Sequence, residues 1–222
     1  MYEFLRGPML WVSVIVFMGG IVFRVVQFFA LSRKKNLLYP CTKEKGKSQS
    51  SLSPEERKIH RIIRYQDSII GRYPVVTVGT SLFHVLIFII PLFLLAHNNL
   101  LYESWKIRLP SFTEPAADTL TIVFLGLAVF FFFRRMALPR VRSLTTAYDY
   151  AVLLVTASPF LTGFIAYHQW FNYRSMVILH MITGEVMLIA ITFTKLGHMI
   201  FFFLARFLVG REYSFGQGRR TW

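Results

Sequence analysis

The segment that most constrains the fold runs from residue 174 to residue 206, RSMVILHMITGEVMLIAITFTKLGHMIFFFLAR. It is apolar enough to cross a lipid bilayer, which favours a membrane-spanning helix. Four ionisable side chains interrupt it: His180, Glu185, Lys195 and His198. Because ionisable groups inside a spanning helix are costly to insert and usually serve a function, these four are the first candidates for a functional site.

The two histidines of this segment are spaced by whole helical turns. His180 and His198 are 18 residues apart, so on a continuous helix of 3.6 residues per turn both imidazoles leave the same face. At 1.5 Å per residue they lie about 27 Å apart, close to the thickness of the hydrocarbon core. The spacing predicts one histidine near each side of the membrane, as two axially ligated haems stacked across it require. Two core histidines satisfied by hydrogen bonds are the alternative.

Composition predicts an integral membrane protein with a single membrane domain, residues 1–222. The chain is 55% hydrophobic, with 23 Phe, too apolar for a soluble domain. Its net charge of +14 is segregated between loops, which indicates topology and not nucleic-acid binding. The single cysteine, Cys41, excludes a disulfide framework and a four-cysteine iron–sulfur cluster, and no CxxCH motif attaches a c-type haem. Any haem is therefore expected to be held non-covalently.

Hydropathy predicts an all-α, five-helix membrane bundle. The expected spans cover about residues 10–31, 75–97, 119–133, 148–168 and 174–206. The first has no small-residue cleavage site after it, so we expect it to be retained and not removed as a signal peptide. The polar segment 32–74 is expected to carry a short amphipathic helix on the membrane surface or under a partner subunit. The Ser53-Pro54-Glu55-Glu56 run is typical of the start of such a helix.

Basic residues set the expected orientation in the membrane. Segment 32–74, loop 134–146 and the C-terminal tail together hold nineteen Lys and Arg. The loops on the other side hold four: Arg6, Lys106, Arg108 and Arg174. By the positive-inside rule, the N-terminus is periplasmic and the C-terminus cytoplasmic, in a bacterial cytoplasmic membrane.

This orientation pairs the histidines by depth. The second span runs outward, which places His84 in the inner half and His97 at the outer end. The fifth span runs inward, which places His180 outside and His198 inside. Depth therefore pairs His84 with His198 at an inner iron, and His97 with His180 at an outer iron.

The sequence alone does not decide which histidine is the fourth haem ligand. On an ideal helix the imidazoles of His84 and His97 point about 140° apart, which does not suit two ligands on one face. Pro91 lies between them and can kink the helix, but the sequence does not show that the kink supplies the needed rotation. His168, at the outer end of the fourth span, is the rival for the outer iron.

Further residues near the histidines could complete such a site. Small residues that could let a porphyrin approach the backbone, or else pack helices together, are Gly79, Gly184 and Gly197. Candidate cations for the propionates at the inner face are Lys195, Arg140, Arg142 and Arg24. Lys195 could instead extend to the membrane interface. Bis-histidine ligation leaves no open iron position, so each haem would carry electrons and not bind oxygen.

Glu185 is the candidate for proton transfer. It lies five residues beyond His180, roughly 7–8 Å deeper along the helix axis. An unpaired carboxylate there would be costly, so we expect it to be protonated or hydrogen-bonded. The functional hypothesis is proton transfer beside a menaquinol site at the outer haem, and the alternative is a hydrogen bond between helices. Lys106 and Arg108 could bind a quinone head group or an acidic cytochrome c, or be solvated loop charges.

Three motifs occur in order along the chain: residues 81–84 (SLFH), residues 134–149 (RRMALPRVRSLTTAYD), and Leu179-His180 followed by Lys195-Leu196-Gly197-His198. Together they resemble the ligand helices and the fourth-helix start of the gamma subunit of respiratory nitrate reductase, a five-helix dihaem cytochrome b. The resemblance covers most of the chain after residue 72. It implies that His84, His180 and His198 bind haem iron.

The chain departs from this family at one ligand. Ten residues after His84, where the family has the second ligand of this helix, stands Leu94, which cannot bind iron. The stretch FHVLIFIIPLFLLAHNN, with Pro91 and His97, is more similar to the cytochromes b of transmembrane redox complexes in sulfate-reducing bacteria, the high-molecular-weight cytochrome complex or the transmembrane complex. This similarity supports His97. It also implies a periplasmic multihaem cytochrome c, a cytoplasmic iron–sulfur protein and other membrane subunits as partners.

The sequence thus predicts a b-type cytochrome with two haem b, the electron-transfer subunit of an oxidoreductase complex. It would relay electrons across the membrane between a periplasmic multihaem cytochrome c or the menaquinone pool and a cytoplasmic iron–sulfur subunit. One alternative is a structural membrane anchor without haem. Another is a proton or ion pathway through Glu185 and Lys195, which the expected absence of broken helices and internal symmetry disfavours.

Overall fold

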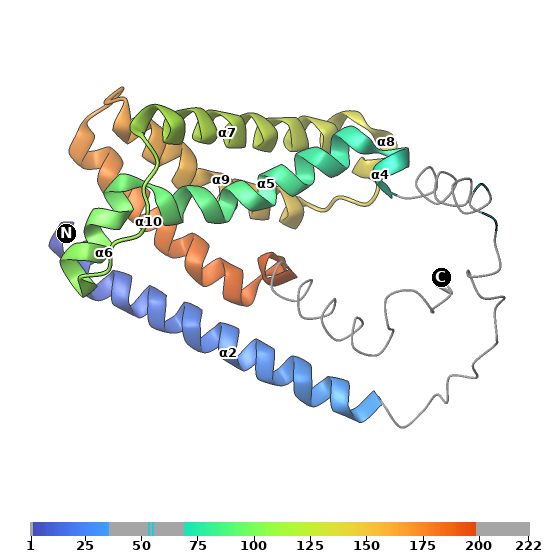
Figure 1. Ribbon diagram of the computed structural model, residues 1–222, viewed down its shortest axis with the longest axis horizontal. Coiled ribbons are helices and arrows are strands. Elements are labelled where there is room, and N and C mark those ends of the chain that lie inside the picture. Colours follow the sequence, from blue (N-terminus) through green and yellow to red (C-terminus); the bar gives the residue numbers. More distant parts are fainter. Residues whose placement is uncertain (1, 36–52, 54, 56–68, 199–222) are drawn as a thin grey trace. The chain divides into compact units, whose positions relative to one another are not determined.

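The computed structural model describes residues 2–35, 53, 55 and 69–198, and every regular element in these ranges is helical (Figure 1). Five helical stretches are long and apolar enough to cross a membrane: Tyr2–Ala30, Pro74–Phe93, Glu114–Ala137, Ala147–Tyr167 and Tyr173–Phe193. The predicted all-α, five-span architecture is confirmed to this extent. The amphipathic helix expected within segment 32–74 falls largely outside the described residues.

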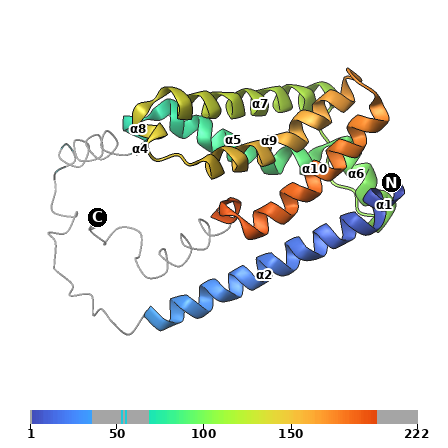
Figure 2. The same cartoon turned by 180° about the vertical axis from the view of Figure 1, so that it is seen from behind.

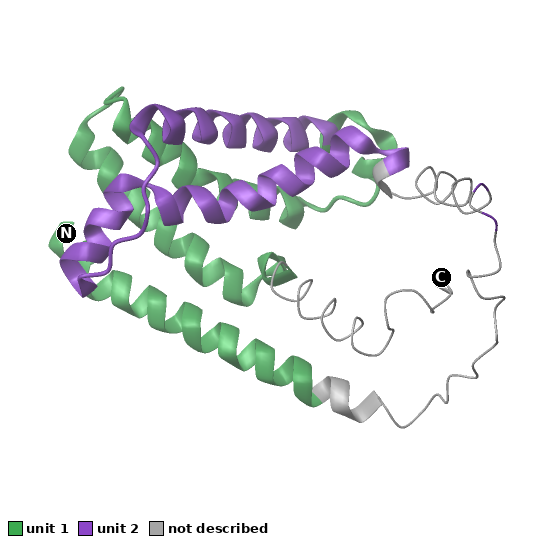
Figure 3. Cartoon of the chain, viewed as in Figure 1, with its two compact units in different colours: residues 1–37, 135–222 green, residues 38–134 purple. Residues whose placement is uncertain are grey.

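The elements in chain order are α1 (Tyr2–Phe4), the π-helical η1 (Leu5–Met9), α2 (Leu10–Lys35), α4 (Ile69–Arg72), α5 (Pro74–Phe93), α6 (Leu95–Trp105), α7 (Glu114–Ala137), α8 (Pro139–Arg142), α9 (Ala147–Tyr167), α10 (Tyr173–Phe193) and the 3-10 turn η3 (Lys195–Gly197). The third span is longer than the predicted 119–133 because the helix extends through polar residues at both ends, which hydropathy does not count. The chain divides into two compact units, residues 1–37 with 135–222 and residues 38–134 (Figure 3).

In the first unit, α2 and α9 both pack against α10, and α2 runs beside α10 in the same direction (Figures 1 and 2). The closest approach of α2 is at Gly20, where an added Cβ would overlap the side chain of Thr192. Ser13 lies seven residues before Gly20 on α2, and Glu185 lies seven residues before Thr192 on α10. Seven residues are about two helical turns, so each pair shares one face of its helix. Ser13 and Glu185 are both buried, at 0% and 4% exposure. We infer that Ser13 and Glu185 lie in the same interface.

The neighbouring glycines of α2 give a direct test of this contact. Gly20→Ala is expected to leave the protein about 1–3 kcal/mol less stable than Gly19→Ala, because only the methyl group at Gly20 would collide with Thr192. Both substitutions gain the same helix propensity. Thermal unfolding in detergent, followed by circular dichroism, measures the difference. Equal unfolding temperatures for the two variants would contradict the contact.

In the second unit, aromatic side chains pack α5 against α7. Phe83 is buried and stacks on Phe124 with ring centroids 4.7 Å apart, and its edge meets Phe131 at 5.6 Å. A Cβ added at Gly79 would lie 3.5 Å from Leu127 and 3.8 Å from Phe131. Gly79 therefore lies where these two helices pack, and an added methyl group there would make ordinary van der Waals contacts.

The second predicted span, 75–97, is not one helix. Helix α5 ends at Phe93, Leu94 is extended (φ −72°, ψ 129°), and α6 starts at Leu95. Pro91 has no N–H to continue the helical ladder, and its ring crowds the preceding turn. The carbonyl oxygen of Phe93 then accepts from the N–H of Phe112 at 2.9 Å, which holds the break open. His97 consequently belongs to α6.

The fifth predicted span, 174–206, is also interrupted. Helix α10 ends at Phe193, and Thr194 is extended (φ −114°, ψ −177°) before the turn η3. The Thr194 hydroxyl accepts from the N–H of Leu196 at 3.2 Å and donates to the carbonyl of Ala190 at 2.6 Å, so the side chain competes with the helical backbone pattern. The argument that His180 and His198 share one face of a continuous helix is therefore wrong. The expected absence of broken helices is wrong as well.

Candidate functional site

The four histidines predicted as ligands share one hydrogen-bonding arrangement. In each, Nδ1 faces a main-chain carbonyl oxygen: His84 that of Thr80 at 2.7 Å, His97 that of Pro91 at 3.0 Å, His180 that of Pro159 at 2.9 Å, and His198 that of Lys195 at 2.6 Å. A carbonyl oxygen can only accept, so Nδ1 carries the proton and Nε2 of the neutral ring carries the lone pair. Metal-binding histidines that coordinate through Nε2 have this arrangement.

His180 is positioned by helix α9. Its ring lies against Gly163, where an added Cβ would be 3.0 Å from Cε1 and 3.1 Å from Nδ1. The Thr162 hydroxyl lies 3.5 Å from Nδ1 and 3.1 Å from the hydroxyl of Thr183. Sequence reasoning missed Gly163; the only signal was a glycine in the second half of the apolar fourth span. Any larger residue there would displace the imidazole.

His84 and His97 occupy different surroundings in the second unit. The half-buried ring of His84 on α5 meets the ring of Phe83 edge-on at 5.8 Å, and Phe83 is itself fixed in the α5–α7 packing. The half-buried His97 donates to the Pro91 carbonyl across the helix break. In a regular helix that carbonyl would accept from the N–H four residues on, so the imidazole replaces a lost helical hydrogen bond. The break, and not a smooth kink, sets the direction of His97.

His168, the rival ligand, is the C-cap of α9 in the first unit. Its exposed ring lies 4.4 Å from that of Phe164 and 5.7 Å from that of Trp170, measured between centroids. Aromatic residues of this kind are enriched where spans meet the membrane surface. The environment of His168 is therefore an aromatic cluster at a helix end.

The turn that carries His198 is tied to the start of α9. Lys195 Nζ pairs with Asp149 Oδ1 at 3.0 Å, and the Lys195 N–H donates to the Tyr148 hydroxyl at 3.4 Å. Asp149 Oδ2 in turn accepts from the N–H and the hydroxyl of Thr146, both at 2.8 Å, which completes a capping box. Lys195, predicted as a propionate cation, is thus paired with Asp149, and its role toward a propionate stays a prediction.

The relative weight of these contacts can be measured. Asp149→Ala is expected to lower the free energy of unfolding more than Lys195→Met does, because it removes half of the capping box as well as the ion pair. Lys195→Met should cost less than about 1 kcal/mol, since the Lys195 side chain is 63% exposed. Denaturant titration in detergent compares the two. A larger loss for Lys195→Met would show that the ion pair, and not the cap, holds this corner.

The other predicted site residues are placed as follows. Arg140 and Arg142 are exposed on α8. Gly197 is buried in η3, whereas a Cβ added at Gly184 meets nothing within 4 Å. Gly184 therefore leaves open space beside α10 in the part of the chain that the structure describes.

Glu185, which the spacing from Thr192 places on the α10 face that meets α2, is buried, and its Oε1 has no hydrogen-bond partner among the described residues. The helix-to-helix hydrogen bond considered above is thus not made by this atom. Position 185 is about 140° around α10 from His180, so the carboxyl group and the imidazole face different neighbouring helices. Within the described ranges, no three His, Cys, Asp or Glu side chains converge on a bare metal site.

Comparison with known proteins finds a relative of matching length. The chain is 37% identical over 226 residues to a protein of Nitratidesulfovibrio vulgaris (strain Hildenborough) described simply as a protein, and the match covers 100% of this chain and 97% of the other. No protein-family model matches the chain, and no solved structure matches it significantly.

Proposed function

We propose that this chain, which belongs to one family with the Nitratidesulfovibrio vulgaris protein, is a dihaem b-type cytochrome of the bacterial cytoplasmic membrane. As a subunit of a redox complex, it would relay electrons between a periplasmic multihaem cytochrome c or the menaquinone pool and a cytoplasmic iron–sulfur subunit. The observation that carries the proposal is the shared state of the four histidines. Each donates Nδ1–H to a backbone carbonyl, which leaves Nε2 as the donor nitrogen for iron.

This donor set fits haem. We assign His84 and His198 to the inner iron, and His97 and His180 to the outer iron, following the depth order along the sequence. A haem held by two imidazoles supplies one-electron transfer and has no open position for oxygen. The contact of His97 Nδ1 with the Pro91 carbonyl, the arrangement shared with the other three, supports His97 as the fourth ligand.

The remaining residues hold the ligands in place. Gly163 gives the His180 ring its space, and the Pro159 carbonyl fixes the ring's tautomer and raises the basicity of Nε2. Asp149 and Lys195 anchor the turn of His198 to α9. We assign the exposed Arg140 and Arg142 as the cations that pair with the haem propionates. The open space beside Gly184 would let a porphyrin approach the backbone of α10.

Glu185 is proposed to move protons for a menaquinol at the outer side. Support comes from its burial and from the absence of a hydrogen-bond partner for Oε1 in the described ranges. A buried carboxyl group without a partner destabilises the fold, and a purely structural role does not explain why it is there. In the loop that the charge distribution assigns to the periplasmic side, Lys106 and Arg108 both lie over the ring of Tyr102, at 5.2 and 4.7 Å. This pair would face an acidic cytochrome c.

Haem content of the purified full chain tests the proposal. We expect a b-type spectrum and two haems per chain by the pyridine haemochrome assay. A His60→Ala/His168→Ala variant, which lacks the two histidines not assigned to iron, should keep both haems. A colourless wild-type chain would refute the proposal. A colourless chain that still assembles with its redox partners would instead support the structural-anchor alternative.

A further inference from the structure

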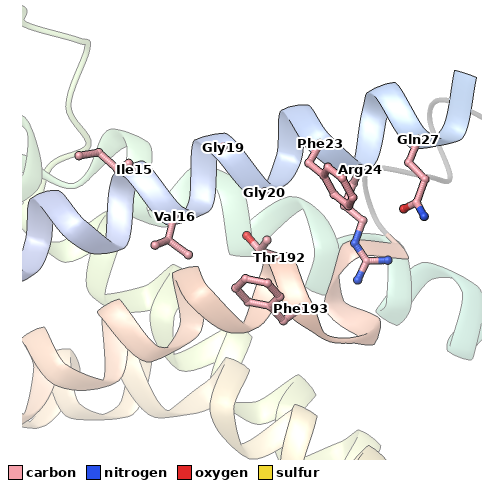
Figure 4. A pocket seen from close by; sticks show the side chains of 9 residues that line it. All are labelled: Ile15, Val16, Gly19, Gly20, Phe23, Arg24, Gln27, Thr192 and Phe193. Carbon is pink, nitrogen blue, oxygen red and sulfur yellow. The ribbon is translucent and has the colours of Figure 1, made fainter. Parts of the chain in front are cut away.

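A groove in the first unit lies between α2 and the C-terminal end of α10 (Figure 4). Its volume is about 630 Å³, and it is a largely open groove. Along α2 it extends from Ile15 to Gln27, twelve residues or about 18 Å. Half of a roughly 30 Å hydrocarbon core is about 15 Å, so the groove has the length of one membrane leaflet.

The groove is apolar at one end and polar at the other. Ile15, Val16 and the two glycines after them line its first part, whereas Arg24 and Gln27 extend from α2 on the side that faces α10 in its last part (Figure 4). The positive-inside rule places this polar end of α2 toward the cytoplasm. The groove therefore has the polarity of the inner leaflet, with apolar lining near the membrane centre and a cation near the surface.

Two polar groups in the groove lack partners among the described residues. Arg24 is half-buried inside the Tyr2–Ala30 span, and none of the acidic side chains that the structure describes pairs with it. Thr192 is 4% exposed, lines the groove, and its Oγ1 has no hydrogen-bond partner in the described ranges. Basic side chains in pockets between spans on the cytoplasmic side of a membrane are suited to bind anionic lipid headgroups.

We infer that this groove binds one anionic glycerophospholipid of the cytoplasmic leaflet, with its phosphate at Arg24 and one acyl chain along Gly19 and Val16. A phosphate ester supplies the missing negative charge and accepts from the guanidinium. The acyl chain covers apolar side chains of α2 and α10 that face the groove. The inference needs the membrane orientation but no haem, so it stands or falls separately from the proposed cytochrome function.

Lipid retention by the purified full chain tests this inference. Native mass spectrometry would count phosphatidylglycerol and phosphatidylcholine retained after equilibration with equal amounts of each. We expect the wild type to retain phosphatidylglycerol in preference, and Arg24→Gln to lower that retention at least about fivefold. Arg33→Gln is the matched control, because it removes the same charge from the same helix nine residues further along the sequence.

A second variant tests the acyl-chain part of the groove. Gly19→Leu is sterically allowed, since a Cβ there meets nothing within 4 Å, and its side chain would fill the groove. We expect it to release the bound lipid, whereas Gly126→Leu, an equally open position of the second unit, should not. Equal losses for Arg24→Gln and Arg33→Gln would reduce the effect to general surface attraction and overturn the inference. Menaquinone retained by the wild type and lost with Arg24→Gln, at unchanged lipid retention, would assign the groove to a quinone.

Discussion

His180→Ala is expected to leave one haem per chain where the wild type holds two, with the outer haem lost. The reason is that axial ligation needs both imidazoles, and no other histidine of the first unit shares the contacts of His180 with Pro159 and Gly163. His198→Ala should remove the inner haem instead. Redox titration followed in the b-type absorbance band would show a single component in each variant. Two components of unchanged potential in either variant would overturn the assignment.

Gly163→Val provides the same test without touching a ligand. Its side chain would enter the space of the His180 ring, whose Cε1 and Nδ1 lie 3.0 and 3.1 Å from the position of a Cβ. We expect the outer haem to be lost or its potential to shift, while the inner haem is kept. Gly126→Val is the matched control, since a Cβ at that position meets nothing within 4 Å. An unchanged pair of haems in Gly163→Val would show that His180 is not held against α9 when it binds iron.

Hydropathy predicted the number and approximate position of the long helices because these depend on local composition. The fourth span, expected at 148–168, is α9, Ala147–Tyr167. Composition does not predict where a helix breaks inside an apolar run. The break at Leu94 depends on a hydrogen bond from the N–H of Phe112, which is distant in sequence, to the carbonyl of Phe93. The break at Thr194 depends on its hydroxyl group, which donates a hydrogen bond to the backbone and accepts one from it.

The candidate site was predictable from the sequence only by residue type. The rule that ionisable residues in apolar spans serve a function identified His84, His97, His180 and His198. The hydrogen bond that each makes to a carbonyl oxygen depends on its side-chain rotamer, which the sequence does not show. Gly163 could not be assigned because its role depends on the packing of α9 against α10. The ion pair of Lys195 with Asp149 was not predictable either, because the sequence does not show that the cap of α9 brings Asp149 to it.

Glu185→Gln is expected to slow menaquinol-linked electron transfer by at least about a hundredfold, the size of a typical general acid–base contribution, with both haems retained. The amide keeps the shape of the side chain but cannot take up and release the proton. Glu185→Leu should slow the reaction equally and stabilise the fold by about 1–3 kcal/mol, because it removes a buried oxygen that lacks a partner among the described residues. Stopped-flow oxidation of a menaquinol analogue and chemical unfolding measure the two effects.

Thr192→Val is the control that separates the two effects of Glu185. Thr192 lies two turns further along the same face of α10 and is as buried as Glu185. Its hydroxyl oxygen, like Oε1 of Glu185, has no hydrogen-bond partner among the described residues. Its replacement should therefore stabilise the fold while leaving menaquinol oxidation unchanged. Reduction of the haems by dithionite should be the same in all three variants, since it needs no quinol proton. If Glu185→Leu stabilised the protein without slowing menaquinol oxidation, the carboxyl group would have no part in proton transfer.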